Sequence, residues 1–238
     1  MKTTVPNYQV RRSSKAKNLR LKVTRDEGLL VVVPKGFDER KIPALLKRKR
    51  TWIADAMKRV EETKRFLEPK PADHLPESVK LTALGETWPV EYREDCRRSG
   101  LWLRAEGGKL VIVGETLNRE AVIRKLKEWL RLRVRENLFP LAESIAAKHR
   151  LEISGLFVKS QRTRWASCSA KRNLSLNTKL LFIPPELVRY VIVHELCHTV
   201  HMNHSNEFWR LVQAYEPAFR TMDARLREAW KRIPPWLF

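Results

Sequence analysis

Apolar and polar residues alternate near the N-terminus, and this alternation predicts a β-hairpin over residues 18–33. Leucine and valine alternate with basic or polar residues over 19–24, as in a half-buried strand. Residues 26–28, Asp-Glu-Gly, can turn the chain into the apolar run 29–33. We therefore expect two paired strands at the start of the chain.

Apolar residues then recur at helical spacing, which predicts one long helix from Asp38 to about residue 66. Asp38 is a suitable N-cap residue. The basic run 47–50 lies off the apolar stripe and is typical of a solvated helix face. The apolar side of this helix is expected to hold Ile42, Leu45, Leu46, Trp52, Ile53, Met57 and Val60.

Prolines interrupt the regular pattern in the middle of the chain. Residues 67–78 contain three prolines among charged neighbours and are predicted to form a linker. A long helix is expected over 119–149, opened by Thr116 or Asn118, with Pro140 kinking or splitting it. Between the linker and this helix, short strands are predicted at 79–84, 87–93, 101–105 and 109–113.

The last third of the chain predicts a second hairpin followed by helices. A strand over 156–161, a polar basic turn over 162–169 and a returning strand over 174–182 form the hairpin. A helix then begins near Pro184 and is expected to end near Asn203, a residue that tolerates the left-handed conformation of a helix stop. Two further helices are predicted, one capped by Ser205 and one over 219–232.

These elements predict an α+β fold. The expected division is an N-terminal β-hairpin with a basic helix at 1–66, the linker 67–78, a small β region at 79–118 and a catalytic domain at 119–238. With 43% apolar residues among 238, the chain has enough material for a sizeable core.

Composition narrows the expected compartment. No stretch of about 18 uncharged apolar residues is present, so no membrane span is expected. The first residues lack the apolar run of a signal peptide. The three cysteines, Cys96, Cys168 and Cys197, are odd in number and widely spaced, which argues for a reducing compartment. We therefore expect a cytoplasmic protein.

Positive charge is concentrated at the two ends of the chain. Residues 1–70 carry 20 Lys and Arg against 8 Asp and Glu, and residues 119–238 carry 22 against 11, within a net charge of +21. Residues 71–118 carry 6 against 8. Such a surface is compatible with a nucleotide or nucleic-acid partner, although a solvated basic surface with no specific partner explains the charge equally well.

The segment 194–198, His-Glu-Leu-Cys-His, predicts a catalytic metal centre on a helix. Two histidines four residues apart point to the same side of a helix, about one turn apart, where both imidazoles can bind one Zn²⁺. Glu195 can reach a metal-bound water without being a ligand and act as general base. A purely structural zinc site is disfavoured, because such sites usually fill all four positions and need no glutamate.

A catalytic zinc needs a third protein ligand, and His204 is the favoured candidate. His201 is seven residues after His194, about 10 Å along an unbroken helix, which is too far for one ion. His204 can return over the metal if the chain turns at residues 202–203. Its spacing from His198 equals that of the metzincins, although position 201 is His where their motif has Gly. Glu207, Glu216 and Asp223 are the alternatives to His204.

Residues around this motif are candidates for binding substrate. Arg162 and Arg164 lie in the turn 162–169 and could hold a carboxylate or phosphate. The alternative is that these arginines are solvated and Trp165 belongs to the core. Cys168 and Cys197 are more often small buried residues than ligands. A donor to the oxyanion of the transition state is also needed, and Tyr190, His201 and Arg164 are its candidates.

The segments 164–168 (RWASC), 174–177 (LSLN), 190–198 (YVIVHELCH) and 203–209 (NHSNEFW) together resemble the YgjP-like metallopeptidase family, a zincin group related to SprT-type proteins. The match is close over 155–212, and residues 12–16 and 52–53 resemble the family more weakly. Ala166 stands where the family usually has Gly. The resemblance implies a zincin-like core, with an HExxH helix, antiparallel strands and flanking helices, behind a β-rich N-terminal region. It also implies zinc on His194, His198 and His204, with Glu195 catalytic.

These observations favour a zinc-dependent metallopeptidase-like hydrolase acting on a peptide or protein. Two alternatives remain open. The first is a metal-dependent nucleoside triphosphate phosphohydrolase, which Arg162 and Arg164 would suit. The second is a protease associated with nucleic acid through the basic ends of the chain. The sequence does not define the natural substrate or the oligomeric state.

Overall fold

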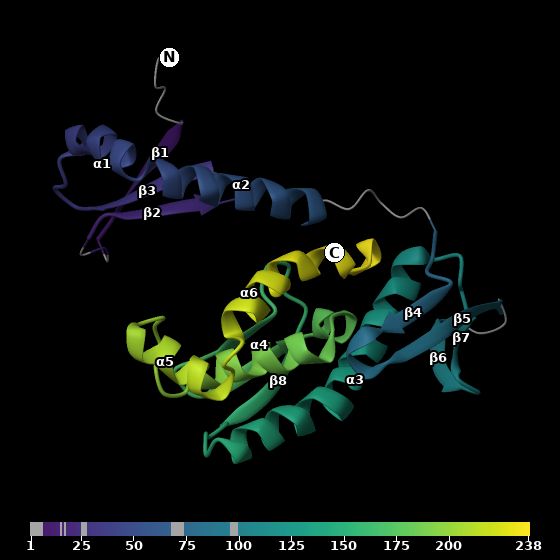
Figure 1. Ribbon diagram of the computed structural model, residues 1–238. Coiled ribbons are helices and arrows are strands. Elements are labelled where there is room, and N and C mark those ends of the chain that lie inside the picture. The colour runs from purple at the N-terminus through teal and green to yellow at the C-terminus, as the bar shows by residue number, and fades with distance from the viewer. Residues whose placement is uncertain (1–6, 15, 17, 25–27, 68–73, 96–99) are drawn as a thin grey trace. The chain divides into compact units, whose positions relative to one another are not determined.

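The computed structural model of the chain describes residues 7–14, 16, 18–24, 28–67, 74–95 and 100–238 (Figure 1). The chain divides into two compact units, Met1–Glu68 and Pro69–Phe238. Half of the expected linker (68–73), residues 26–27 of the expected first turn and Cys96 fall outside the described residues.

The first unit is a three-stranded sheet with helices packed against it. β2 (Arg20–Thr24) and β3 (Gly28–Pro34) pair antiparallel, which confirms the predicted hairpin. β1 (Tyr8–Ser13), which the sequence did not predict, pairs parallel to β3. The resulting order is β1-β3-β2. The buried side chains of this core are Leu29, Val31, Val33, Ile42, Leu46 and Ile53.

The single helix expected after Asp38 is two helices. The Asp38 carboxylate accepts from the Arg40 N–H, as expected of a cap, and precedes a 3-10 turn over Glu39–Lys41. α1 (Ile42–Arg48) and α2 (Arg50–Leu67) follow, broken at Lys49. The expectation that Trp52 and Met57 lie on the apolar side is wrong, and Trp52 is 43% exposed. A three-stranded sheet covers only a narrow stripe of these helices, so residues flanking that stripe remain in solvent.

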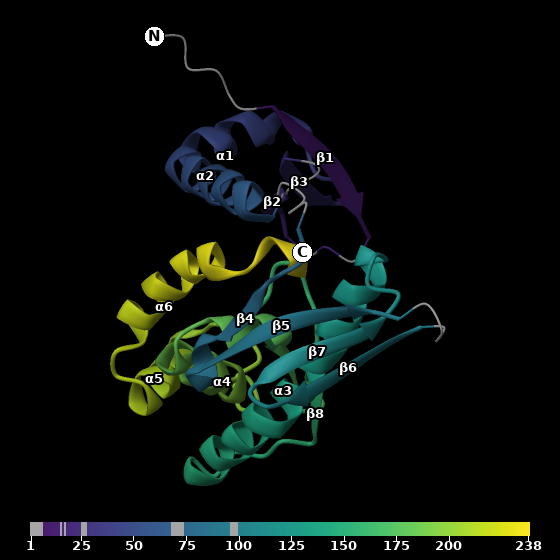
Figure 2. The ribbon, with the colours of Figure 1, turned by 90° about the vertical axis from the view of Figure 1, so that its right-hand side faces the viewer.

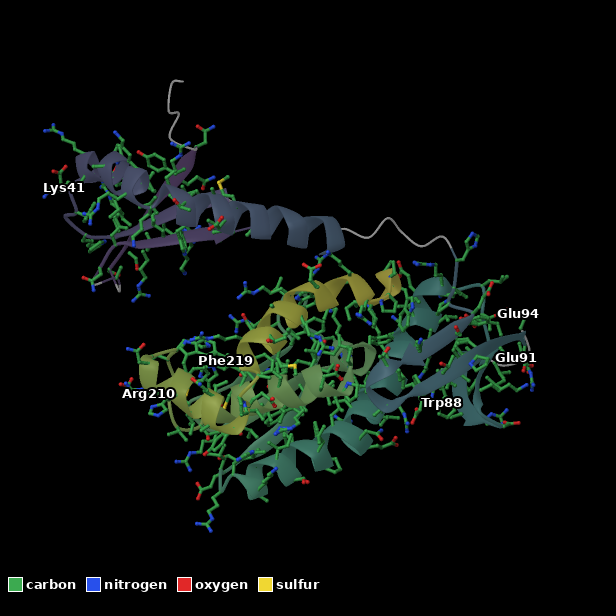
Figure 3. The ribbon with its side chains drawn as sticks, in the orientation of Figure 1. Lys41, Trp88, Glu91, Glu94, Arg210 and Phe219 are labelled. Atoms are coloured by element: carbon green, nitrogen blue, oxygen red, sulfur yellow. The ribbon has the colours of Figure 1, made fainter. Side chains whose placement is uncertain are left out.

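The second unit contains a four-stranded sheet of order β4-β5-β7-β6 (Figure 2). Its strands are β4 (Ser78–Leu81), β5 (Glu86–Glu94), β6 (Leu101–Glu106) and β7 (Lys109–Gly114). β5 and β7 run parallel, whereas the other neighbours are antiparallel. Trp88 on this sheet, labelled in Figure 3, meets Trp129 edge to face with ring centroids 5.7 Å apart. This contact joins the sheet to the following helix.

α3 (Arg119–Lys148) is one continuous helix through Pro140, so the expectation of a split there is wrong. The Asn118 side chain accepts from the Ala121 N–H, which confirms its predicted capping role. Pro140 leaves one carbonyl of the preceding turn without a helical partner. Pro140 lies on the exposed face, where water can satisfy that carbonyl. The opposite face buries residues at helical spacing along the whole helix.

A second sheet packs beside α3, and its topology differs from the predicted hairpin. β8 (Gly155–Lys159) and β10 (Asn173–Asn177) are parallel, and β9 (Ala166–Cys168) inside the expected turn pairs antiparallel with β10. The expected second half of the returning strand is instead a 3-10 helix, Thr178–Phe182. All five of its residues are buried. A fully buried apolar run has no exposed face from which a strand and a helix could be distinguished.

Three helices complete the second unit. They are α4 (Pro185–Cys197), α5 (Asn206–Tyr215) and α6 (Phe219–Glu228). Short 3-10 turns follow at Ala229–Arg232 and Pro235–Leu237, so the last predicted helix is shorter than expected. α4 contacts α3, α5 and α6, and its buried side lies in the main core. Phe219, labelled in Figure 3, stacks on Trp209 of α5 with ring centroids 5.5 Å apart.

The observed fold is therefore a mixed α+β arrangement. Among the described residues, no helix is both long enough and apolar enough to cross a membrane.

Candidate metal centre

The end of α4 brings two histidine rings together. His194 lies in the last turn of α4, and His198 is its C-cap residue with φ −68° and ψ −14°. Because His198 keeps a helical backbone, the two side chains project on the same side, with ring centroids 5.2 Å apart. The opposite face of α4 is anchored by buried aliphatic side chains, so this end of the helix is held firmly.

His204 joins this pair from the segment that follows. Its Nε2 is 3.1 Å from Nε2 of His194. One ligand atom from each of His194, His198 and His204 lies within 4.8 Å of the other two. Two nitrogens about 2.0–2.1 Å from one tetrahedral zinc lie roughly 3.3 Å apart, close to the distance seen here. The three imidazoles are therefore a group that could hold one metal ion.

The chain bends at residues 202–203 before His204, as expected, but the preceding helix ends earlier than expected. α4 ends at Cys197 rather than near Asn203, and the N–H groups of Val200 and His201 both donate to the Cys197 carbonyl. Among the described residues other than glycine, only Arg150 and Arg172 have positive φ, so the expected left-handed Asn203 is wrong. Ser205 then caps α5 by accepting from the Phe208 N–H, as predicted.

Hydrogen bonding and burial prepare these rings for a metal. Nδ1 of His198 is 3.0 Å from the His201 carbonyl oxygen, to which it donates, so Nε2 keeps its lone pair. Burial lowers the pKa of His194 to about 3, helped by the neighbouring rings of His198 and His204. Burial also lowers the pKa of His204. Neutral imidazoles are the form that binds a metal.

Glu195 lines the same cleft as the three histidines. Burial raises the pKa of its carboxyl group to about 7, while the donated N–H of Cys168 and the charge of Arg164 lower it. A carboxyl group with a pKa near neutrality is suited to accept and return a proton. The N–H that holds Glu195 comes from β9, the strand that the sequence did not predict.

The cleft around these groups has a volume of about 500 Å³. One wall is the segment 163–168, and the floor is α4. Further lining residues come from α6 and from the turn after α4. They include Met202, Asp223 and Leu226. The cleft therefore combines polar and apolar lining residues, as expected of a site that orients a substrate.

The candidate substrate-binding residues divide between the cleft and its surroundings. Arg164 and Tyr190 line the cleft, whereas Arg162 and His201 do not. Tyr190 is 1% exposed, and within the described part of the chain its hydroxyl has no hydrogen-bond partner. Burial raises the pKa of Tyr190, so its hydroxyl stays protonated and can donate. Trp165 is buried and stacks on Trp230, which bears out the alternative that it belongs to the core.

The three acidic alternatives to His204 do not belong to the cluster of potential metal ligands formed by His194, His198 and His204. Glu207 is held at the start of α5 by Ser205, and Glu216 forms an ion pair with Arg189 at 3.5 Å. Asp223 lines the cleft but is paired with Arg227.

Asn177 is a residue whose role the sequence did not reveal. Its side-chain amide donates to the carbonyls of Gln161 and Arg164, both at 2.7 Å, and its Oδ1 accepts from the Lys179 N–H at 3.1 Å. These bonds fix both ends of the loop that leads into the cleft wall. The position of Asn177 at the end of an apolar strand was the only signal, and it does not identify the loop that the amide would bind.

Replacing Asn177 with Ala is expected to lower the free energy of unfolding by about 2–4 kcal/mol, because three hydrogen bonds of a side chain only 1% exposed are lost. The matched control is Asn137→Ala, which removes one bond to the Arg133 carbonyl and should cost about 1 kcal/mol. Urea unfolding followed by circular dichroism measures both. Equal losses in the two variants would contradict this role for Asn177.

A cleft with three clustered imidazoles and a buried carboxyl group is typical of metal-dependent hydrolases. The chain matches the family described as YgjP-like, metallopeptidase domain, over residues 17–229. The chain belongs to this YgjP-like metallopeptidase family, whose description implies a divalent metal and a hydrolytic activity. A search of curated proteins finds no match.

Proposed function

We propose that the protein is a zinc-dependent metallopeptidase whose metal is held by His194, His198 and His204. The observation that carries this proposal is the convergence of three imidazole nitrogens within 4.8 Å, with the Glu195 carboxyl group lining the same cleft. A purely imidazole donor set suits Zn²⁺ better than Mg²⁺, which prefers oxygen ligands. Cys168 and Cys197 are free thiols, in keeping with a reducing, cytoplasmic location.

Three residues of the cleft have a proposed role in peptide hydrolysis, beside the metal. A bound Zn²⁺ supplies a Lewis acid and a water of lowered pKa. Glu195 takes a proton from the attacking water and returns it to the leaving amine. The buried hydroxyl of Tyr190 donates to the oxygen that becomes negative in the transition state. Arg164 binds a carbonyl or carboxylate group of the substrate along the cleft wall.

Zinc-loaded protein is expected to cleave denatured proteins and peptides, because an open cleft of about 500 Å³ admits an extended segment. Mass spectrometry of the products identifies the bonds cut. A chelated sample serves as the control and should leave the substrates intact.

The rival activity is phosphate release from nucleoside triphosphates, which Arg164 in the cleft would support. The same zinc-loaded sample is therefore offered the four nucleoside triphosphates with Zn²⁺, Mg²⁺ or Mn²⁺. We expect peptide products and no phosphate. Metal-dependent phosphate release without any peptide product would overturn the peptidase assignment in favour of the phosphohydrolase.

A further inference from the structure

A second groove, of about 630 Å³, lies between the first half of α3 and the C-terminal segment 235–238. Figures 1 and 2 both place this segment beside the beginning of α3. The groove shares no lining residue with the cleft of the metal centre. It is therefore a separate cavity of the same unit.

The lining of this groove is strongly basic. The lining includes four cations, Arg119, Arg124, Lys127 and Arg131, and two acids. One of the acids, Glu128, is paired with Lys125 at 2.9 Å. Residues 124, 127 and 131 are three and four apart, so they form one row along α3. Within the described part of the chain, none of these three forms an ion pair. The row therefore presents its positive charges to whatever occupies the groove.

Positive charge continues from this groove towards the metal centre. The ammonium of Lys179, 1% exposed, donates to the Gln161 carbonyl at 2.9 Å and lies 4.9 Å from the centre of the Phe238 ring. Both contacts are with uncharged groups. Burial, together with the charges of Lys127 and Arg162, lowers the pKa of Lys179 to about 8. The like charges of Lys127, Arg162 and Lys179 thus lie within electrostatic reach of one another.

A further cation, Arg162, lies in the loop that borders the catalytic cleft. Arg162 is the last of the interacting cations, and the cleft wall begins at the next residue, Thr163. The three cations along α3 therefore suit a ligand that carries a series of negative charges. A single small anion would engage only part of this surface.

The groove combines this row with aromatic side chains. Phe238, which is half-buried, lines the groove together with Trp236, which is only 9% exposed and belongs to the core. A basic groove with aromatic faces is the arrangement that binds single-stranded nucleic acids, since cations contact phosphates and bases pack against rings. Two of the three cations in the row are arginines, whose guanidinium groups match phosphate oxygens bidentately. The net charge of +21 adds long-range attraction for such a polyanion.

We propose that this groove binds single-stranded nucleic acid, with phosphates on Arg124, Lys127 and Arg131 and a base against Phe238. This binding goes beyond the proposed peptidase function and does not depend on it.

The test is the binding of a fluorescently labelled oligothymidylate, measured by anisotropy at several salt concentrations in the presence of a chelator. The variant Arg124→Ala/Lys127→Ala/Arg131→Ala is expected to bind at least about tenfold more weakly than wild type. The slope of log affinity against log salt should become shallower by about 2, because each phosphate contact on a single strand contributes about 0.7. Alanine is the best helix former, so α3 should remain intact, which circular dichroism verifies.

A matched control removes three positive charges elsewhere on the same unit, in Lys80→Ala/Arg135→Ala/Lys148→Ala. These residues are exposed and do not line the groove. The control should retain the wild-type salt slope. Equal weakening of both triple variants would show diffuse attraction and overturn the site, as would absence of binding by the wild type. Equal competition by polyglutamate would contradict the assignment to nucleic acid. Because a chelator is present throughout, failure of the metal centre leaves this result unaffected.

Discussion

Replacing Glu195 with Gln is expected to lower kcat/KM for peptide cleavage by about 10²–10⁴-fold, the contribution typical of a general base. Gln has nearly the same shape and retains an oxygen that can accept from the Cys168 N–H, so the side chain should keep its place. It cannot take a proton from water. Glu195 is absent from the group of clustered metal ligands, so metal content should be unchanged.

The measurement compares initial rates on one peptide substrate with zinc content determined on the same samples. Glu143→Gln provides a matched change of charge on the exposed surface of α3, away from the cleft, and should behave as wild type. Undiminished cleavage by the zinc-loaded Glu195→Gln variant would refute a general-base role. Loss of zinc in that variant would instead indicate that Glu195 is a ligand.

Replacing His204 with Ala is expected to weaken zinc binding more than the 10–100-fold that loss of a hydrogen-bonded neighbour of a ligand costs. The ring lost here is itself one of the three that converge, with Nε2 3.1 Å from that of His194. The stabilisation that zinc gives the folded protein grows with the logarithm of its affinity, so the rise in Tm on adding zinc should be much smaller in this variant. Isothermal titration with a zinc buffer gives the affinity directly.

His201→Ala is the matched control, since it removes a histidine from the same turn. His201 contacts His198 through its backbone carbonyl, which alanine retains, and its side chain does not line the cleft. This variant should bind zinc within a few-fold of wild type. A larger loss in His201→Ala than in His204→Ala would exchange the roles assigned to these two residues.

The sequence allowed the starts of α3 and α5 to be predicted, because local chemistry specifies a helix cap. Asn118 and Ser205 cap helices as expected, since a short polar side chain satisfies N–H groups only two or three residues away. The approach of His198 to His194 follows from helix geometry alone. The approach of His204 could be favoured from its spacing, and the chain bends at residues 202–203 as expected, although the helix ends earlier and Asn203 is not left-handed.

Contacts between distant segments explain what the sequence could not predict. The parallel pairing of β8 with β10 depends on a crossover, and alternation of apolar residues carries no strand direction. Asn177 binds carbonyls 13 and 16 residues earlier in the chain, and no local pattern indicates such partners. The break at Lys49 and the exposure of Trp52 likewise depend on how much of each helix the small sheet covers.

X-ray absorption at the zinc edge of the zinc-loaded protein tests the metal centre most directly. The expected spectrum shows three imidazole nitrogens and one oxygen at about 2.0–2.1 Å, a tetrahedral set with one open position for water. His204→Ala should lose one imidazole from this set, and Glu195→Gln should leave it unchanged. A sulfur ligand near 2.3 Å, from Cys168 or Cys197, or only two imidazoles in the wild type, would contradict the His194, His198 and His204 centre.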